Sequence, residues 1–218
     1  ATGEIVAFLD DDAIAEPDWL AQLSLAFEDP RVLGAGGYIE PLWLAGRPAW
    51  FPPEFGWVVG CSYRGLPEAT APVRNVIGCN MAFRRRAWAA VGGFRTDLGH
   101  LGSQPRGCDE TEFCIRLGQR WPRHRLLYVP SARVLHRVPA ARTRFRYFRT
   151  RCLLEGQTKA LVARIVGARD GLASERAHAA RALPRGVARE LGHALRHRQP
   201  AGFARAGAIV AGLEITDA

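Results

Sequence analysis

The sequence predicts an α/β fold: a mixed sheet with flanking helices, followed by an α-helical C-terminal extension. Two observations predict this class. Over about the first 140 residues, short apolar runs typical of strands alternate with amphipathic segments typical of helices, an order that indicates an α/β domain. From about residue 143 onward the pattern is helical and rich in arginine. We therefore expect two parts, residues 1–140 and residues 141–218.

The length and composition agree with this division. The 218 residues are enough for a domain with a substantial core, and 48% of them are hydrophobic. The chain starts with Ala1 and enters an apolar run at residues 5–9 almost at once. We therefore expect this sequence to be part of a longer protein. Its apolar runs all fall short of the roughly 18 residues that a membrane-spanning helix requires.

The first half begins with a strand at residues 5–9, which ends in three aspartates. Pro17 suits the first turn of a helix that reaches about Phe27, and an Asp-Pro pair at residues 29–30 ends it. Residues 32–39 predict the next strand.

Residues 41–74 are rich in proline, glycine and tryptophan and show no clean period. We interpret them as a long loop with a functional role, because their aromatic content argues against disorder. A strand at residues 76–83 and a short helix at residues 84–91 follow, and Gly92-Gly93 ends that helix.

The remaining elements follow the same reasoning. The expected elements are a loop at 103–108, a helix at 109–120, short strands at 126–129 and 133–135, and helices from about 143, with breaks near 167–171, Pro184 and Pro200.

The net charge of +9 is unevenly distributed. Residues 1–136 carry 14 basic and 15 acidic side chains, whereas residues 137–205 carry 16 basic and 4 acidic ones. The basic 137–205 segment suits contact with phosphate or with an anionic membrane surface. A solvated, arginine-rich helical face explains the same pattern. We expect a cytoplasmic protein, with peripheral contact to the inner face of the plasma membrane as an option.

The five cysteines are odd in number and show no CxxC spacing. This pattern predicts neither a zinc site nor a disulfide framework. Free thiols in a reducing cytoplasm are the simplest interpretation.

The strongest local signal is the triplet Asp10, Asp11 and Asp12 after the first strand. Adjacent carboxylates do not all ionise cheaply without a compensating cation, and a hard ion such as Mg²⁺ or Mn²⁺ prefers oxygen ligands. Asp10 and Asp12 are two residues apart and would face the same side of an extended backbone. A solvated acidic turn that caps the next helix is the alternative.

A second signal is the acidic start of the helix predicted at residues 109–120. An ionised Asp109 or Glu110 in the first turn is favoured by the helix dipole and could act as a general base. Asp109 could equally be a simple N-cap. Glu112 is expected to pair with Arg116, four residues later, in a structural role.

A third signal is His136, at the end of a short predicted strand. A lone histidine is more often a core or surface residue than a ligand. If the two acidic sites converge, His136 becomes a further candidate for contact with a metal or a phosphate.

The order of these signals resembles the family 2 glycosyltransferases, over about residues 1–160. The matching segments, in chain order, are Phe8-Leu9-Asp10-Asp11-Asp12 for the DxD motif, residues 75–84 for the acceptor-side strand, Gly92-Gly93-Phe94 for the "GGF" turn, Asp109-Glu110 for the "ED" motif, and His136.

The resemblance implies a partial GT-A (Rossmann-like) fold. Residues 1–140 would be its acceptor- and metal-binding half, and the nucleotide-binding half would be missing. Asp10, Asp12 and His136 would hold Mg²⁺ or Mn²⁺, and Asp10 and Asp11 would lie next to a nucleotide-diphosphate sugar.

The resemblance also implies the chemistry. Glu110 stands at the position of the family's catalytic base, but the two acids are reversed here, so either Asp109 or Glu110 could serve. The reaction would transfer the sugar, with inversion, to a hydroxyl of a sugar, lipid-phosphate or glycan acceptor. Without the missing half, we expect the isolated chain to be nearly inactive.

Two other functions are compatible with parts of the sequence. An arginine-rich nucleic-acid-binding module would use the Arg-aromatic stretch near residues 142–151, but it leaves the acidic sites unexplained, so we expect no nucleic-acid partner. A metal-dependent phosphohydrolase would need ligands for a second metal, and residues 1–60 do not offer an obvious set.

Overall fold

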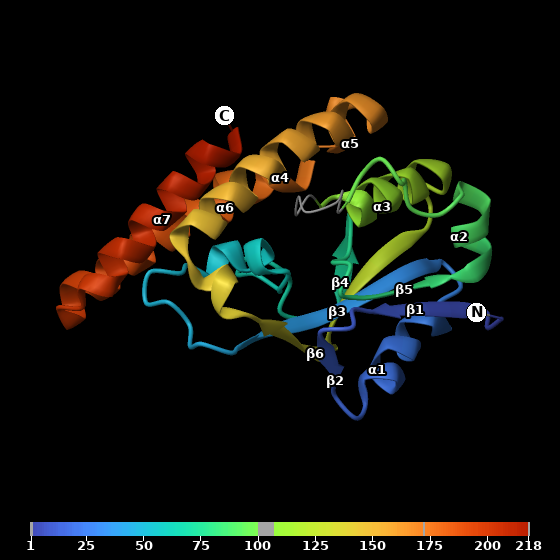
Figure 1. The fold of residues 1–218 in the computed structure, drawn as a ribbon. Coiled ribbons are helices and arrows are strands. Elements are labelled where there is room, and N and C mark those ends of the chain that lie inside the picture. Colours follow the sequence, from blue (N-terminus) through green and yellow to red (C-terminus); the bar gives the residue numbers. More distant parts are fainter. Residues whose placement is uncertain (1, 100–106, 172, 218) are drawn as a thin grey trace.

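The computed structural model describes residues 2–99, 107–171 and 173–217, and Figure 1 shows their arrangement. Over these residues the chain forms one six-stranded mixed sheet with flanking helices and a helical C-terminal extension. The predicted fold class is therefore confirmed.

Two long parallel strands, β3 (Val32–Trp43) and β6 (Arg125–Val138), form the centre of the sheet. On one side, β5 (Asn80–Arg84) runs antiparallel to β3, and β1 (Ile5–Leu9) runs antiparallel to β5. The short strand β2 (Ala13–Ala15) pairs with the far side of β6. The three aspartates therefore lie on the connection between β1 and β2. In the sheet order, β5, β3 and β6 lie between these two strands.

The remaining short strand, β4 (Ala71–Val73), also pairs with β6. It lies inside the segment predicted as loop, as does a 3-10 helix, η2 (Pro53–Val59). The aromatic side chains of this segment give it this structure, because Phe51 and Phe55 are buried in the main core.

The sheet is covered on both faces. The helix α1 (Trp19–Leu25), extended by η1 (Ala26–Glu28), packs on β6 and β3. Figure 1 shows α2 (Arg85–Val91) and α3 (Asp109–Arg120) on the other side of the sheet.

The C-terminal extension begins with η3 (Ala140–Thr143) and continues as a layer of helices. Its helices are α4 (Phe145–Val166), α5 (Ala168–Gly171), α6 (Ala173–His197) and α7 (Pro200–Asp217). Both α4 and α6 pack against α7, and Figure 1 shows these three helices side by side. Among the helices in the described part of the chain, none combines the length and the hydropathy needed to cross a bilayer.

A bulge interrupts β6 opposite Gly37. The register passes from Val129 opposite Gly37 to Arg133 opposite Tyr38. A Cβ atom on Gly37 would lie 1.8 Å from the carbonyl oxygen of Ala132, so only glycine fits there. The buried Asn80 donates a hydrogen bond of 2.9 Å to that same carbonyl.

Several predicted boundaries were wrong. The two strands expected at residues 126–129 and 133–135 are one strand, because β6 continues through the bulge. The strand expected at residues 76–83 starts only at Asn80. Pro184 does not break α6, since packing of that helix on α7 outweighs the hydrogen bond that proline cannot make.

Other expectations hold. The helix at residues 109–120 has the predicted bounds, and helix breaks occur at Gly167 and before Pro200. Of the loop expected at residues 103–108, the first four residues lie outside the described residues.

Candidate active site

The three aspartates form a tight turn that is tied to β6 by backbone hydrogen bonds. The amide of Ala13 donates to the carbonyl of Asp10 at 3.1 Å, and the amide of Arg137 donates to the carbonyl of Asp12 at 3.0 Å. Because Ala13 pairs with His136 in the β2–β6 register, the turn brings Asp12 next to that histidine.

His136 is only 3% exposed and lies between a carboxylate and a thiol. Its Nε2 atom is 3.2 Å from Oδ1 of Asp12, and its Nδ1 atom is 3.6 Å from Sγ of Cys61. Burial lowers the pKa of His136, against the opposing effect of Asp12. Gly60, with φ +80°, leaves room for the ring, since a Cβ atom there would lie 3.1 Å from Cε1.

Cys79 completes this group, and it was not among the predicted site residues. One potential ligand atom each from Asp10, Cys79 and His136 lies within 4.8 Å of the other two. Cys79 lies beside Asp10 because Leu9 pairs with Asn80 in the β1–β5 register, and no pattern in the sequence reveals that register. Burial raises the pKa of the Cys79 thiol to about 12, and the nearby Asp10 and Asp12 add to the shift.

The structure thus brings together Asp10, Asp12 and His136. Asp11, between the two other aspartates, is exposed to solvent. The donor set of carboxylates and an imidazole suits a divalent cation, and the thiol of Cys79 extends it.

The start of α3 carries the second predicted group. Cys108 holds the N-cap position with a left-handed backbone (φ 72°), and Asp109 is the first residue of the helix. The N-cap role considered for Asp109 is therefore wrong. The predicted pair between Glu112 and Arg116 is present at 2.8 Å, and Arg116 also donates to the carbonyl of Gly93.

Glu110 is partly buried and lies next to a second carboxylate. Burial raises the pKa of Glu110 to about 8, and the charge and hydrogen bond of Asp109 contribute to the increase. Such a carboxylate exchanges protons near neutral pH, which is the property that a general base requires.

Both predicted groups contribute to the lining of one large cavity of about 1030 Å³. From the first group Asp10 lines it, next to Cys79, whereas Asp12 and His136 are not lining residues; from the second group Asp109 and Glu110 line it. Phe55 and Trp57 of η2 add an aromatic wall. A cavity of this size, with convergent polar groups on apolar walls, is the usual form of a small-molecule site.

The helical extension supplies a wall of paired charges. Lys159 lies 3.3 Å from Glu155 and 3.6 Å from Glu175, Arg151 lies 3.2 Å from Glu155, and Arg74 lies 2.7 Å from Glu175. Burial opposes the charged form of Glu155, but Lys159 and Arg151 outweigh it and hold the pKa of Glu155 below its usual value. Paired charges of both signs offer donors and acceptors to sugar hydroxyls.

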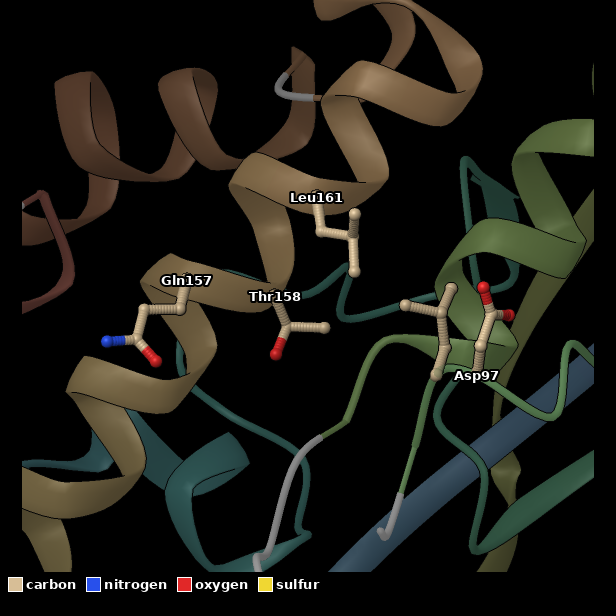
Figure 2. A pocket seen from close by; sticks show the side chains of 5 residues that line it. Asp97, Gln157, Thr158 and Leu161 are labelled. Atoms are coloured by element: carbon tan, nitrogen blue, oxygen red, sulfur yellow. The ribbon is translucent and has the colours of Figure 1, made fainter.

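A second cavity is much smaller. It has a volume of about 60 Å³, and Figure 2 shows Thr158 and Leu161 of α4 across from Asp97 at its edge. This volume holds a few water molecules at most, so the large cavity is the candidate site.

A family model and two curated proteins match this chain. Residues 1–92 match the model of glycosyl transferase family 2. A glucosyl-dolichyl phosphate glucuronosyltransferase from Haloferax volcanii is 39% identical over 159 residues, which are 72% of this chain and 50% of that protein. The succinoglycan biosynthesis protein ExoM from Rhizobium meliloti is 30% identical over 161 residues, 72% of this chain and 48% of that protein.

The fold is also similar to that of a solved structure. The mannosyltransferase PcManGT from Pyrobaculum calidifontis, solved with GDP-Man and Mn²⁺, superposes with a TM-score of 0.52 at 20% identity, over 98% of this chain and 62% of that one. The chain spans about half the length of the curated relatives that it matches. Residues 1–92 therefore belong to glycosyl transferase family 2, and the chain that contains them has a fold of the GT-A type.

Proposed function

We propose that this chain carries the metal- and acceptor-binding part of an inverting glycosyltransferase, which moves a sugar from a nucleotide-diphosphate sugar to an acceptor hydroxyl. One observation carries this function. Asp10 and Glu110 are distant in the sequence, yet they line the same cavity. A group that holds the donor and a group that deprotonates the acceptor must share such a space.

In the proposed step, a carboxylate oxygen of Glu110 takes the proton from the acceptor hydroxyl. The acceptor oxygen forms its bond to the anomeric carbon while the bond from that carbon to the diphosphate breaks, so the nucleoside diphosphate leaves and the carbon inverts. Asp109 is the alternative base. The charge and the hydrogen bond of Asp109 raise the proton affinity of Glu110.

Asp10, Asp12 and His136 are proposed to hold a divalent ion such as Mg²⁺ or Mn²⁺. When bound, such an ion would neutralise the leaving diphosphate as a Lewis acid. The oxygen and nitrogen donors of these residues converge in the described structure, which supports the assignment. Exposed Asp11 is proposed to face the nucleotide.

The relatives support the substrate classes. The Haloferax volcanii protein bears glucosyl-dolichyl phosphate in its name, which supports an acceptor that is a lipid phosphate or a glycan linked to one. The Pyrobaculum calidifontis structure contains GDP-Man and Mn²⁺, which supports a nucleotide-sugar donor and a divalent ion.

We also propose that the protein works on the cytoplasmic face of a membrane, with peripheral contact through the 137–205 segment. Large apolar side chains are exposed on the three long C-terminal helices, among them Phe145, Leu195 and Phe203. Vesicle flotation would test this contact, and equal recovery with neutral and anionic vesicles would contradict the arginine contribution.

The central experiment uses the gene product in its natural length. It is incubated with Mn²⁺, a panel of nucleotide sugars and a lipid-phosphate extract, and transfer is followed by labelled sugar in the product. We expect transfer that depends on the metal and the acceptor. Release of inorganic phosphate without acceptor would support the phosphohydrolase instead, and salt-sensitive binding of nucleic acid without transfer would support the nucleic-acid module.

A further inference from the structure

Cys79 is a buried cysteine next to the end of β1, where the three aspartates begin. The proposed function does not use it. It is the residue directly before β5, and β1 ends opposite the first residue of that strand. This register holds Cys79 beside Asp10 as the chain leaves β1. The position of the thiol is therefore fixed by the sheet.

The neighbours of Cys79 are a carboxylate and an imidazole. Ligand atoms of Asp10, Cys79 and His136 lie within 4.8 Å of one another, from three separate parts of the chain. Among the described residues, this is the group of three potential metal ligands that meets such a limit. Two of the three, Cys79 and His136, are buried, so their side chains have little freedom to move apart.

The chemical types of these ligands decide which ion they suit. Mg²⁺ takes oxygen ligands almost alone, whereas thiolate and imidazole select softer ions such as Zn²⁺ and Co²⁺. Zinc sites that bind a small molecule use three protein ligands drawn from Cys, His and Asp or Glu and leave a further position open.

We propose that Asp10, Cys79 and His136 form a metal site that disfavours Mg²⁺, the harder of the two ions named under the proposed function, and that prefers thiophilic divalent ions such as Zn²⁺ or Co²⁺. The site shares Asp10 and His136 with the proposed function and rests on it for its role in transfer, but not for its existence. Binding releases the thiol proton of Cys79 to solvent, and the sulfur becomes a thiolate ligand. Cys61, 3.6 Å from the other ring nitrogen, helps to orient His136.

The test measures metal binding without any sugar nucleotide. The tag-free protein is stripped with a chelator and titrated with Co²⁺, whose thiolate complexes absorb in the near ultraviolet, and Zn²⁺ is then added in competition. We expect a thiolate band in the wild type and in Cys152→Ser, the matched control, because Cys152 is a buried free cysteine in α4. Cys79→Ser should lose the band.

The affinities give the second readout. Loss of outer-shell partners alone typically weakens metal binding about 10–100-fold, so Cys79→Ser should weaken Zn²⁺ binding by at least about tenfold and leave Mg²⁺ binding unchanged. Asp10→Asn removes a ligand at an exposed position, where folding is not at risk. It should weaken Zn²⁺ binding while a thiolate band remains.

Cys79 is not a ligand if Cys79→Ser keeps the wild-type band and Zn²⁺ affinity, or if the wild type shows no band. Displacement of Co²⁺ by Mg²⁺ at comparable concentrations would also overturn the selectivity. A loss of sugar transfer alone would leave the spectra unchanged and would count against the proposed function instead.

Discussion

At the scale of single residues, Glu110 and Asp109 are adjacent carboxylates in one cavity, and substitution separates their roles. We expect Glu110→Gln to lower turnover by about 10²–10⁴-fold, because that is the usual contribution of a general base, while donor binding stays unchanged. Asp109→Asn is the matched variant. Turnover is measured with labelled donor, and full activity of Glu110→Gln together with a loss in Asp109→Asn would assign the base to Asp109.

The raised pKa of Glu110 predicts the pH dependence. A base must be unprotonated, and a carboxyl with a pKa of about 8 is mostly protonated at lower pH. We therefore expect kcat/KM to rise with pH and to fall about tenfold per unit below that pKa. The apparent value belongs to the Asp109–Glu110 pair. A profile that stays flat down to pH values near the ordinary carboxyl range would contradict the assignment.

Much of the candidate site could be predicted at this scale, because the chemistry of Asp10, Asp12 and Glu110 is visible in residue types and spacing. Cys79 could not, since its role depends on which residue of β5 stands opposite the end of β1. Five cysteines without CxxC spacing suggest free thiols, and the type of residue alone does not show which of them meets other ligands.

At the scale of elements, the Glu112–Arg116 pair fixes α3 to the turn that ends α2. Glu112 is 1% exposed, and Arg116 donates to it at 2.8 and 3.0 Å while also donating to the carbonyls of Val91 and Gly93. Glu112→Ala leaves a partly buried arginine without its carboxylate.

We expect Glu112→Ala to lower the free energy of unfolding by roughly 2–4 kcal/mol, somewhat under the range for a fully buried pair because Arg116 is partly exposed. Urea denaturation measures the loss. The control is Glu40→Ala, whose pair with Arg133 joins side chains that are 44% and 47% exposed. An exposed pair contributes about 1 kcal/mol at most, and equal losses in the two variants would contradict the difference in burial.

Helices were predicted more closely than strands, for a physical reason. The helix at residues 109–120 is specified by local features, its acidic first turn and its apolar periodicity. Strand ends depend on partners that are distant in the sequence. The bulge between Val129 and Arg133 contacts Gly37 and Asn80, which are distant in the sequence. No periodicity within β6 carries that information.

At the scale of the whole molecule, the sequence pattern separated residues 1–140 from the basic extension at 141–218. The packing joins the two parts: Phe148, Leu183 and Ile209 of the helices lie in the same core cluster as Val32 and Val134 of the sheet. The helices also line the cavity that Glu110 borders. A charge pattern marks surfaces and cannot show such a shared core.

This shared core predicts cooperative unfolding. Phe148 of α4 is fully buried, with its ring centroid 6.0 Å from that of Phe51 and 5.2 Å from that of Phe55. We expect Phe148→Ala to cost about 3–5 kcal/mol, as large truncations in cores do. The control is Phe145→Ala on the same helix, where the ring is 47% exposed and less than half of that loss is expected.

Two probes make the test specific to the whole molecule. All six tryptophans precede residue 141, so their fluorescence reports the sheet and its loops, whereas circular dichroism reports mainly the long C-terminal helices. In a molecule with one core, both transitions coincide and Phe148→Ala shifts them together. If Phe148→Ala shifts the dichroism transition and leaves the fluorescence transition in place, the C-terminal helices unfold as a separate unit, as the boundary at residue 140 predicts.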